Sequence, residues 1–157
     1  MSVFYAPLIG LSCFALIILC ILVHENARFD AETKKKFYGT YIVLMLCSVA
    51  EYLGFSLNGA ATATIGIHAF AKCMDFILSP LVAVFFVRQI YDKAEWMKVM
   101  YGFIGVNAVI EIASMFTGWT FYIDSSNNYH HGPFYMIYTL IYIVCIIAVI
   151  ASFIAYG

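Results

Sequence analysis

Five long apolar stretches alternate with short polar segments along the chain. About 20 apolar residues in a helix are enough to cross a hydrocarbon core of about 30 Å. The predicted membrane helices are residues 4–23, 37–57, 67–90, 96–120 and 134–156. The first stretch has no charge before His24 and is too long for a signal peptide, so we expect a retained helix. The pattern predicts an all-α fold, a polytopic membrane bundle of five transmembrane helices formed by residues 1–157 as one unit.

Composition agrees with a lipid environment. Hydrophobic residues make up 64% of the chain and charged residues 11%, whereas soluble domains average about 45–50% and about 25%. Mean hydropathy is +0.93. The formal net charge of −1 gives no basic field for nucleic acid. The five cysteines all lie in apolar stretches without CxxC spacing, which predicts small core residues and neither a disulfide framework nor a metal site: Cys13, Cys20, Cys47, Cys73 and Cys145.

The basic residues predict an orientation. Seven of the eight lysines and arginines flank the first and third links between helices: Arg28, Lys34, Lys35, Lys36, Arg88, Lys93 and Lys98. The positive-inside rule then places the amino terminus and the second and fourth links outside the cytoplasm. The last apolar run reaches Gly157 without a basic stop, and we therefore expect the chain to be the amino-terminal part of a longer protein.

The third stretch carries polar residues through a segment otherwise suited to lipid. His68, Lys72, Asp75 and Ser79 are spaced i, i+4, i+7 and i+11, which places them within an arc of roughly 60° at about 100° per residue. Ionisable groups in a membrane helix are costly, face the bundle interior or a water-filled cavity, and mark candidate functional sites. Pro80 in the same stretch predicts a kink.

Acidic residues in the neighbouring stretches are the expected partners. Glu51 lies in the second and Glu111 in the fourth, with Asn107 one turn before Glu111. Counted from the outer loops at 1.5 Å per residue, the charged groups form one layer roughly 9–14 Å deep. The predicted ligand-binding residues of this outer-half polar cavity are Glu51, His68, Lys72, Asp75, Asn107 and Glu111.

A plainer interpretation competes with a binding site. Interhelical hydrogen bonds often only hold a bundle together, at about 0.6 kcal/mol each, and Lys72 with Asp75 could be a satisfied internal pair. However, Lys72 is the only cation for three carboxylates, so we expect either protonation of an acid or binding of a cationic group. No metal-ligand spacing is present, and no cofactor or metal is predicted.

The loop from Phe121 to Pro133 is the second concentration of polar residues. Asp124 to Asn128 predicts a turn, and Gly132-Pro133 predicts a hinge into the fifth helix. His130 and His131 are candidates for titration near pH 6.5 or for ligand contact. The alternative is a solvated connection.

A set of short sequences along the chain resembles a known family. The matching residues are Glu25-Asn26, Arg28-Phe29-Asp30, Lys36-Phe37-Tyr38, Glu51-Tyr52-Leu53-Gly54, Leu57-Asn58-Gly59, His68 with Lys72, Ser79-Pro80, Phe121-Tyr122-Ile123-Asp124, Asn128-Tyr129 and Gly132-Pro133. Together they resemble the amino-terminal multi-helix sensor region of bacterial GGDEF-type diguanylate cyclases, and more distantly the seven-helix amino-terminal region of some histidine kinases.

The resemblance implies a sensor in the bacterial cytoplasmic membrane, with further helices and a cytoplasmic output domain after Gly157. It also leaves room for a homodimer formed through that missing domain and for a role in cyclic-di-GMP signalling. This chain itself has no GGDEF signature, no nucleotide-binding loop and no kinase histidine region. We therefore expect no enzyme activity from it, although the full-length protein could be a diguanylate cyclase.

The function expected from these observations is a sensor module that binds a small unidentified ligand, or senses protons, in the outer half of the bilayer. A ligand would act by binding two helix arrangements with different affinity. A small transporter or proton-coupled carrier subunit is the main alternative, although no inverted repeat is visible. A purely structural subunit is a third class. An intramembrane enzyme has the least support, because the chain lacks HExxH and related motifs.

Overall fold

A computed structural model describes residues 5–91 and 94–156 of the protein. Its elements are α1 (Tyr5–Glu25), α2 (Ala31–Leu57), the short 3-10 helix η1 (Thr62–Thr64), α3 (Ile65–Ile90), α4 (Ala94–Thr117), β1 (Phe121–Ile123), β2 (Tyr129–His131) and α5 (Tyr135–Tyr156). Five helices in the described residues are long and apolar enough to cross a membrane. The predicted all-α bundle of a multi-pass membrane protein is confirmed.

Two helix boundaries differ from the prediction for local reasons. α2 begins at Ala31 instead of 37, because the Asp30 side chain accepts a hydrogen bond from the Thr33 amide and caps the helix. α4 ends at Thr117 instead of 120. Gly118 adopts a left-handed conformation with φ +71°, which stops a helix at this position. The polar link before α2 and the start of the outer loop are therefore part of the ordered architecture.

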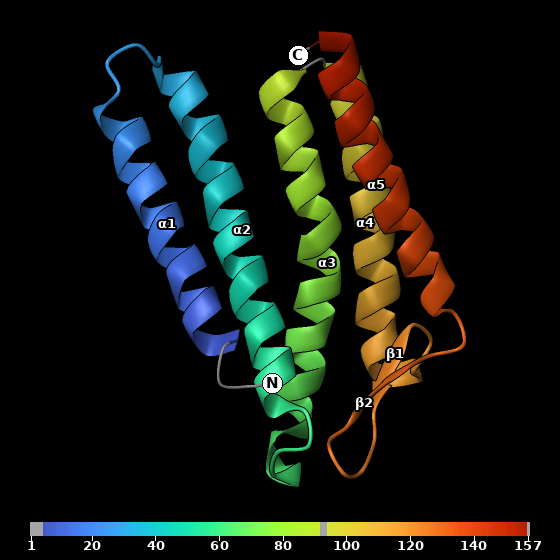
Figure 1. The fold of residues 1–157 in the computed structure, drawn as a ribbon. Coiled ribbons are helices and arrows are strands. Elements are labelled where there is room, and N and C mark those ends of the chain that lie inside the picture. Colours follow the sequence, from blue (N-terminus) through green and yellow to red (C-terminus); the bar gives the residue numbers. More distant parts are fainter. Residues whose placement is uncertain (1–4, 92–93, 157) are drawn as a thin grey trace.

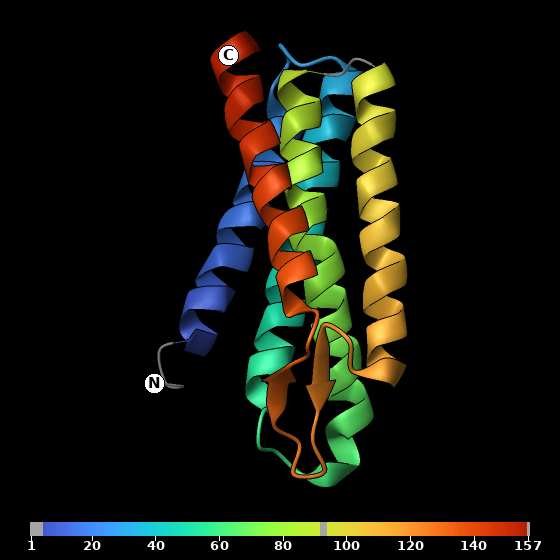
Figure 2. The same cartoon turned by 90° about the vertical axis from the view of Figure 1, so that its right-hand side faces the viewer.

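Successive helices run in alternating directions, and the bundle has two distinct ends. The start of α1, the α2–α3 loop and the β-hairpin lie at one end, whereas the α1–α2 link, the start of α4 and the end of α5 lie at the other (Figures 1 and 2). α3 packs against α2, α4 and α5, while α1 packs mainly on α2. In α3, 44% of the most apolar segment is buried, against 11% in α1. The helix that carries His68, Lys72 and Asp75 is therefore the centre of the bundle.

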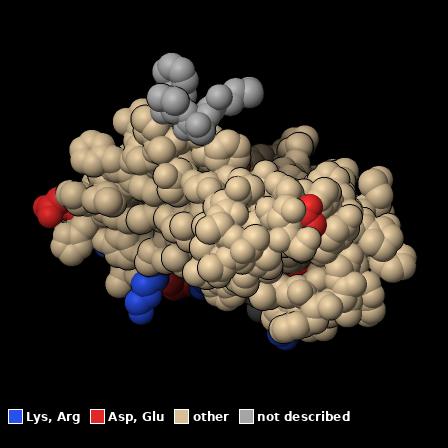
Figure 3. Space-filling view, turned by 90° about the horizontal axis from the view of Figure 1, so that it is seen from below, with Lys and Arg blue, Asp and Glu red and all other residues tan. Residues whose placement is uncertain are grey.

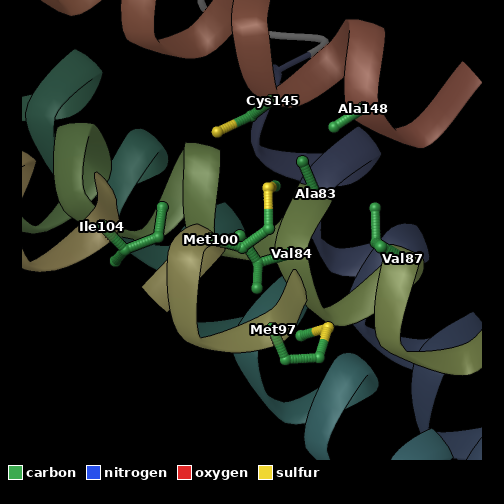
Figure 4. Packing of buried hydrophobic residues seen from close by; sticks show 8 residues of the cluster. All are labelled: Ala83, Val84, Val87, Met97, Met100, Ile104, Cys145 and Ala148. Atoms are coloured by element: carbon green, nitrogen blue, oxygen red, sulfur yellow. The ribbon is translucent and has the colours of Figure 1, made fainter. Parts of the chain in front are cut away.

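The main apolar core lies toward the end opposite the hairpin. It consists of eight side chains from three helices: Ala83, Val84 and Val87 of α3, Met97, Met100 and Ile104 of α4, and Cys145 and Ala148 of α5 (Figure 4). Val84 and Val87 have no exposed surface. All five cysteines are free thiols. The core holds α3, α4 and α5 together on the side of the polar residues that faces away from the hairpin.

The loop after α4 folds into a short antiparallel hairpin. β1 pairs with β2 in the register Phe121 with His131, Tyr122 with His130 and Ile123 with Tyr129. The turn predicted at Asp124 to Asn128 joins the strands, but the strands themselves were not predicted. Gly132 allows the chain to pass close to the end of α4, because a Cβ there would lie 2.3 Å from the carbonyl oxygens of Gly118 and Trp119. The hairpin is thus held against α3 and the end of α4.

Candidate functional site

Lys72 and Asp75 form an ion pair inside the bundle. The distance from Lys72 Nζ to Asp75 Oδ2 is 3.6 Å, and their side chains are 16% and 12% exposed. Ser79 Oγ donates to Asp75 Oδ1 at 3.3 Å. The lysine stem passes over Gly54, where an added Cβ would lie 2.7 Å from Lys72 Cε. The Lys72 ammonium lies 5.2 Å from the ring centre of Tyr129, so it is held by a carboxylate and an aromatic ring together.

Glu51 lies outside this ion pair but within electrostatic reach of Asp75. It lies on an exposed face of α2, and its Oε1 accepts a hydrogen bond of 2.6 Å from the hydroxyl of Tyr5 on α1. Glu51 therefore lies at the exposed side of the predicted layer of charges, where α1 contacts it.

Glu111 is fully buried between α4 and the hairpin. Its Oε2 accepts a hydrogen bond of 2.6 Å from Thr120 Oγ1. The Thr120 amide in turn donates to Ser114 Oγ at 3.2 Å. Glu111 Oε1 has no hydrogen-bond partner in the described part of the chain. The carboxyl group is thus fixed on one oxygen and unsatisfied on the other.

Asn107 compensates for the proline in α3. Its Nδ2 donates to the Phe76 carbonyl oxygen at 3.0 Å. Phe76 lies four residues before Pro80, and a proline has no N–H to donate to that carbonyl. α3 continues through Pro80, and a side chain of α4 supplies the missing hydrogen bond. Such replacement by a neighbouring helix is how membrane helices tolerate proline.

Asn127 fastens the hairpin to the α2–α3 loop. The residue is fully buried and has a left-handed backbone with φ +62°. Its Nδ2 lies within hydrogen-bond distance of four oxygens at 2.9 to 3.3 Å: the carbonyls of Leu57, Ala60 and Ala61 and Oγ1 of Thr64. The Gly59 amide donates to the Asn127 carbonyl at 2.8 Å. The tip of the hairpin is therefore locked onto the preceding loop.

The same asparagine orients His68. Asn127 Oδ1 lies 2.9 Å from His68 Nδ1. An amide oxygen only accepts hydrogen bonds, so His68 carries its proton on Nδ1 in this arrangement. His68 has no exposed surface, and its Nε2 has no partner among the described residues. His68 is thus a buried contact of the hairpin.

Asp124 organises the turn of the hairpin. Its Oδ1 accepts from the amides of Ser126 and Asn128 at 2.9 and 2.8 Å, and its Oδ2 lies 2.9 Å from His130 Nε2. The hydrogen bond from the Asn128 amide and that from His130 lower the pKa of Asp124 to about 2. The turn is therefore built around an ionised carboxylate.

Aromatic rings fill the space where α3, α5 and the hairpin meet. Phe76 stacks on Tyr138 at 4.3 Å between ring centres and meets Phe121 edge-on at 5.5 Å. Tyr129 and Tyr135 pack against the same cluster. Phe121 is fully buried. This aromatic cluster connects the hairpin to the segment of α3 that lies just before Pro80.

The six predicted residues thus occupy four neighbouring places and not one cavity wall. Lys72 and Asp75 pair on α3, Asn107 and Glu111 share one face of α4, His68 contacts the hairpin, and Glu51 lies on α2. Two surface hollows of about 430 Å³ lie elsewhere and contain none of the six. In residues 5–91 and 94–156, no three His, Cys, Asp or Glu side chains are grouped to hold a metal ion.

Sequence reasoning missed the residues that connect these places. Thr120 was assigned to the fourth helix, Asn127 lay within the predicted turn without a role of its own, and Tyr129 was noted only among the residues of the family resemblance. The Asn127-Asn128 pair in the turn was the available signal, because asparagine adopts left-handed conformations more readily than most residues. Its long-range partners could not be inferred from that signal.

The Glu111 carboxyl group can bind or release a proton, and hydrogen bonds link the hairpin region to α3 and α4. Asn127 bonds His68, Thr120 bonds Glu111, and Asn107 bonds the Phe76 carbonyl that Pro80 leaves free. Comparisons with protein-family models, curated proteins and solved structures found no match. What the protein does is therefore inferred from its own residues.

Proposed function

We propose that this protein is a membrane-embedded sensor module whose outer half responds to protons or to a small ligand. The observation that carries the proposal is the double attachment of the hairpin. Asn127 bonds it to the α2–α3 loop and to His68, while Thr120 bonds it to the buried Glu111. A change of charge or contact at either place would alter how the hairpin holds α3 against α4.

The orientation is part of the proposal. The described basic residues outside α3's interior belong to the segments at the end opposite the hairpin: Arg28, Lys34, Lys35, Lys36, Arg88 and Lys98. Seen from the hairpin end, lysine and arginine atoms appear only at the margin (Figure 3). The positive-inside rule then puts the hairpin outside and the basic end in the cytoplasm.

A path for the response runs along α3. The aromatic cluster joins the hairpin to Phe76, and the Phe76 carbonyl is bonded by Asn107 because of Pro80. A missing hydrogen bond within a helix, as at Pro80, is a place where the direction of the helix can change. A ligand or proton that favours one arrangement of α3 and α4 would shift the helix ends at the basic side, to the extent that it binds the two arrangements differently.

Two tryptophans make the proposal testable, since Trp119 lies beside the hairpin and Trp96 near the start of α4 at the other end. In Trp119→Phe protein in lipid nanodiscs, Trp96 is the only tryptophan, and we expect its emission to change between pH 5 and pH 9. Glu111→Gln should abolish that change, whereas Glu32→Gln, an acid that is 77% exposed, should not. Equal titrations in all three proteins would contradict the proposal.

A proton-coupled carrier is the second candidate, and the burial of Glu111 favours it, because carriers use intramembrane acids in this way. Proteoliposomes with a pH-sensitive dye inside distinguish the two functions. A carrier would show proton flux that depends on Glu111. A sensor would show the Trp96 response without flux.

The sequence resemblance supports placing this module ahead of a cyclic-di-GMP output domain in a bacterial cytoplasmic membrane. An antibody against the hairpin, used on membranes of the source organism, tests this extension. A band well above 17.6 kDa, the mass of these residues, is expected. A band at that mass would exclude a fused output domain.

A further inference from the structure

Two buried acceptor atoms on one face of α4 lack hydrogen-bond partners among the described residues. They are Asn107 Oδ1 and Glu111 Oε1, and neither side chain has exposed surface. Residues at i and i+4 are neighbours on a helix surface. The second polar atom of each is already used, because Asn107 Nδ2 donates to the Phe76 carbonyl and Glu111 Oε2 accepts from Thr120. The donation to Phe76 also fixes which end of the Asn107 amide is the oxygen.

No cation balances Glu111 in the described structure. Lys72 is paired with Asp75, and Glu111 takes part in none of the ion pairs of the described residues. The titratable groups in electrostatic contact with it include the Cys73 thiol of α3 and the Tyr129 phenol of β2. Neither group becomes a cation. An unpaired carboxylate buried in this way tends to be neutralised.

The same surroundings limit what could neutralise it. Hard metal ions such as Ca²⁺ require six or more oxygen ligands, and only two unpartnered oxygens are present on this face. A bound proton requires one acceptor for its hydrogen bond. Asn107 Oδ1 is such an acceptor, one helical turn away.

We propose that Glu111 and Asn107 form a proton-binding site, with the proton on Glu111 Oε1 donated to Asn107 Oδ1 directly or through one water molecule. One proton satisfies both unpartnered acceptors and removes the buried charge. The inference names the proton as the ligand of the proposed sensor and in that sense rests on it. Loss of the proton would leave a carboxylate beside the amide oxygen and would disturb the Asn107 bond to Phe76 at the proline break.

The experiment is infrared spectroscopy of the protein in lipid nanodiscs, with its glutamates labelled by ¹³C at the side-chain carboxyl. At pH 7 we expect the carbonyl stretch of a protonated carboxyl group, displaced by the label and therefore from glutamate. The band should be lost in Glu111→Gln and kept in Glu51→Gln, since Glu51 is also a glutamate far from the ends of its membrane helix but is exposed. Asn107→Leu should shift the band, and the sodium concentration should not affect it.

Three results would overturn the inference. One is labelled wild-type protein without a protonated glutamate at pH 7, which decides the matter even if Glu111→Gln fails to fold. Another is a band that survives in folded Glu111→Gln. The third is a band that disappears as sodium is added, which would indicate a sodium site. A band as expected without any Trp96 response would leave the proton site standing and contradict the sensor function.

Discussion

Asn127 is the residue whose side chain joins the hairpin to the helices. It reaches the carbonyls of Leu57, Ala60 and Ala61, and it orients His68. Its left-handed backbone at φ +62° places the amide in this position. A single side chain therefore sets both the position of the hairpin and the tautomer of a buried histidine.

Two substitutions at Asn127 separate the contribution of its side chain to stability from that of its backbone conformation. Asn127→Gly keeps the left-handed conformation and removes the hydrogen bonds, and we expect it to lower the free energy of unfolding by about 2 kcal/mol. Asn127→Ala should lower the free energy of unfolding by about 1 kcal/mol more, because a positive φ is unfavourable for alanine. Unfolding in mixed micelles and hydrogen exchange of residues 121–131 measure both effects. Two variants as stable as the wild type, with unchanged exchange, would show that the contact is incidental.

The lowered pKa of Asp124 predicts how the stability of the turn depends on pH. Its pKa is lowered to about 2 by the hydrogen bonds from the Asn128 amide and His130, whereas an unfolded aspartate has a pKa of about 3.9. The ionised group therefore stabilises the turn fully above about pH 4, and this contribution is lost as the pH falls toward 2. Hydrogen exchange of the Ser126 and Asn128 amides should be slow at pH 5 after correction for intrinsic rates. Asp124→Asn should already have faster exchange at pH 5, and equal protection in both proteins would refute the assignment.

At the scale of elements, α3 and α4 are joined where α3 lacks a hydrogen bond of its own. Pro80 frees the Phe76 carbonyl, and Asn107 binds it at 3.0 Å. The two residues should therefore be energetically coupled although they are on different helices. The coupling has a definite sign, because restoring an N–H at residue 80 makes Asn107 less necessary.

A double-mutant cycle measures this coupling. Asn107→Leu should destabilise the wild-type protein by about 1 kcal/mol, the scale of an interhelical hydrogen bond in a membrane. In a Pro80→Ala background the new amide can bond the Phe76 carbonyl, and the same change should cost clearly less. Val106→Leu is a matched control on the exposed face of α4. Additive effects in the cycle would rule out the proposed compensation.

Sequence pattern predicted the elements better than their mutual orientation. Five apolar stretches gave five helices, because a span needs a length that few other structures share. Strands of three residues gave no comparable signal, and the end of α4 depended on Gly118. Polar caps such as Asp30 were visible in the sequence but were not used. Local chemistry therefore decided the boundaries that the hydropathy pattern missed.

The candidate site was predictable within one helix and not across helices. The shared face of Lys72 and Asp75 followed from helix geometry, and their pairing was one of the alternatives considered. Glu51 and Glu111 depended on how α2 and α4 are rotated. Helices that are apolar on nearly all sides carry little information on rotation, so the predicted common layer rested on depth alone. The structure instead places Glu51 on an exposed face and Glu111 beneath the hairpin.

For the whole molecule, the proposed orientation places the hairpin outside and the basic links inside. It can be tested in a cysteine-free background with single cysteines at two exposed positions, Ser125 in the hairpin turn and Ala27 in the α1–α2 link. Ser125→Cys should react with a membrane-impermeant maleimide on intact cells. Ala27→Cys should react only after the membrane is opened. The opposite pattern would reverse the orientation and place the proposed sensing end in the cytoplasm.

The central claim is that the protonation of polar groups near the hairpin changes the arrangement of the helices at the opposite end. Distances between spin labels at Ala27 and Ala155, which are both exposed at that end, measure it most directly in nanodiscs. We expect the distance distribution to shift by about 2 Å or more between pH 5 and pH 9, the size of helix movements in known switches. Glu111→Gln should keep the acidic distribution at both pH values. A wild-type distribution that is the same at pH 5 and pH 9 would contradict the claim.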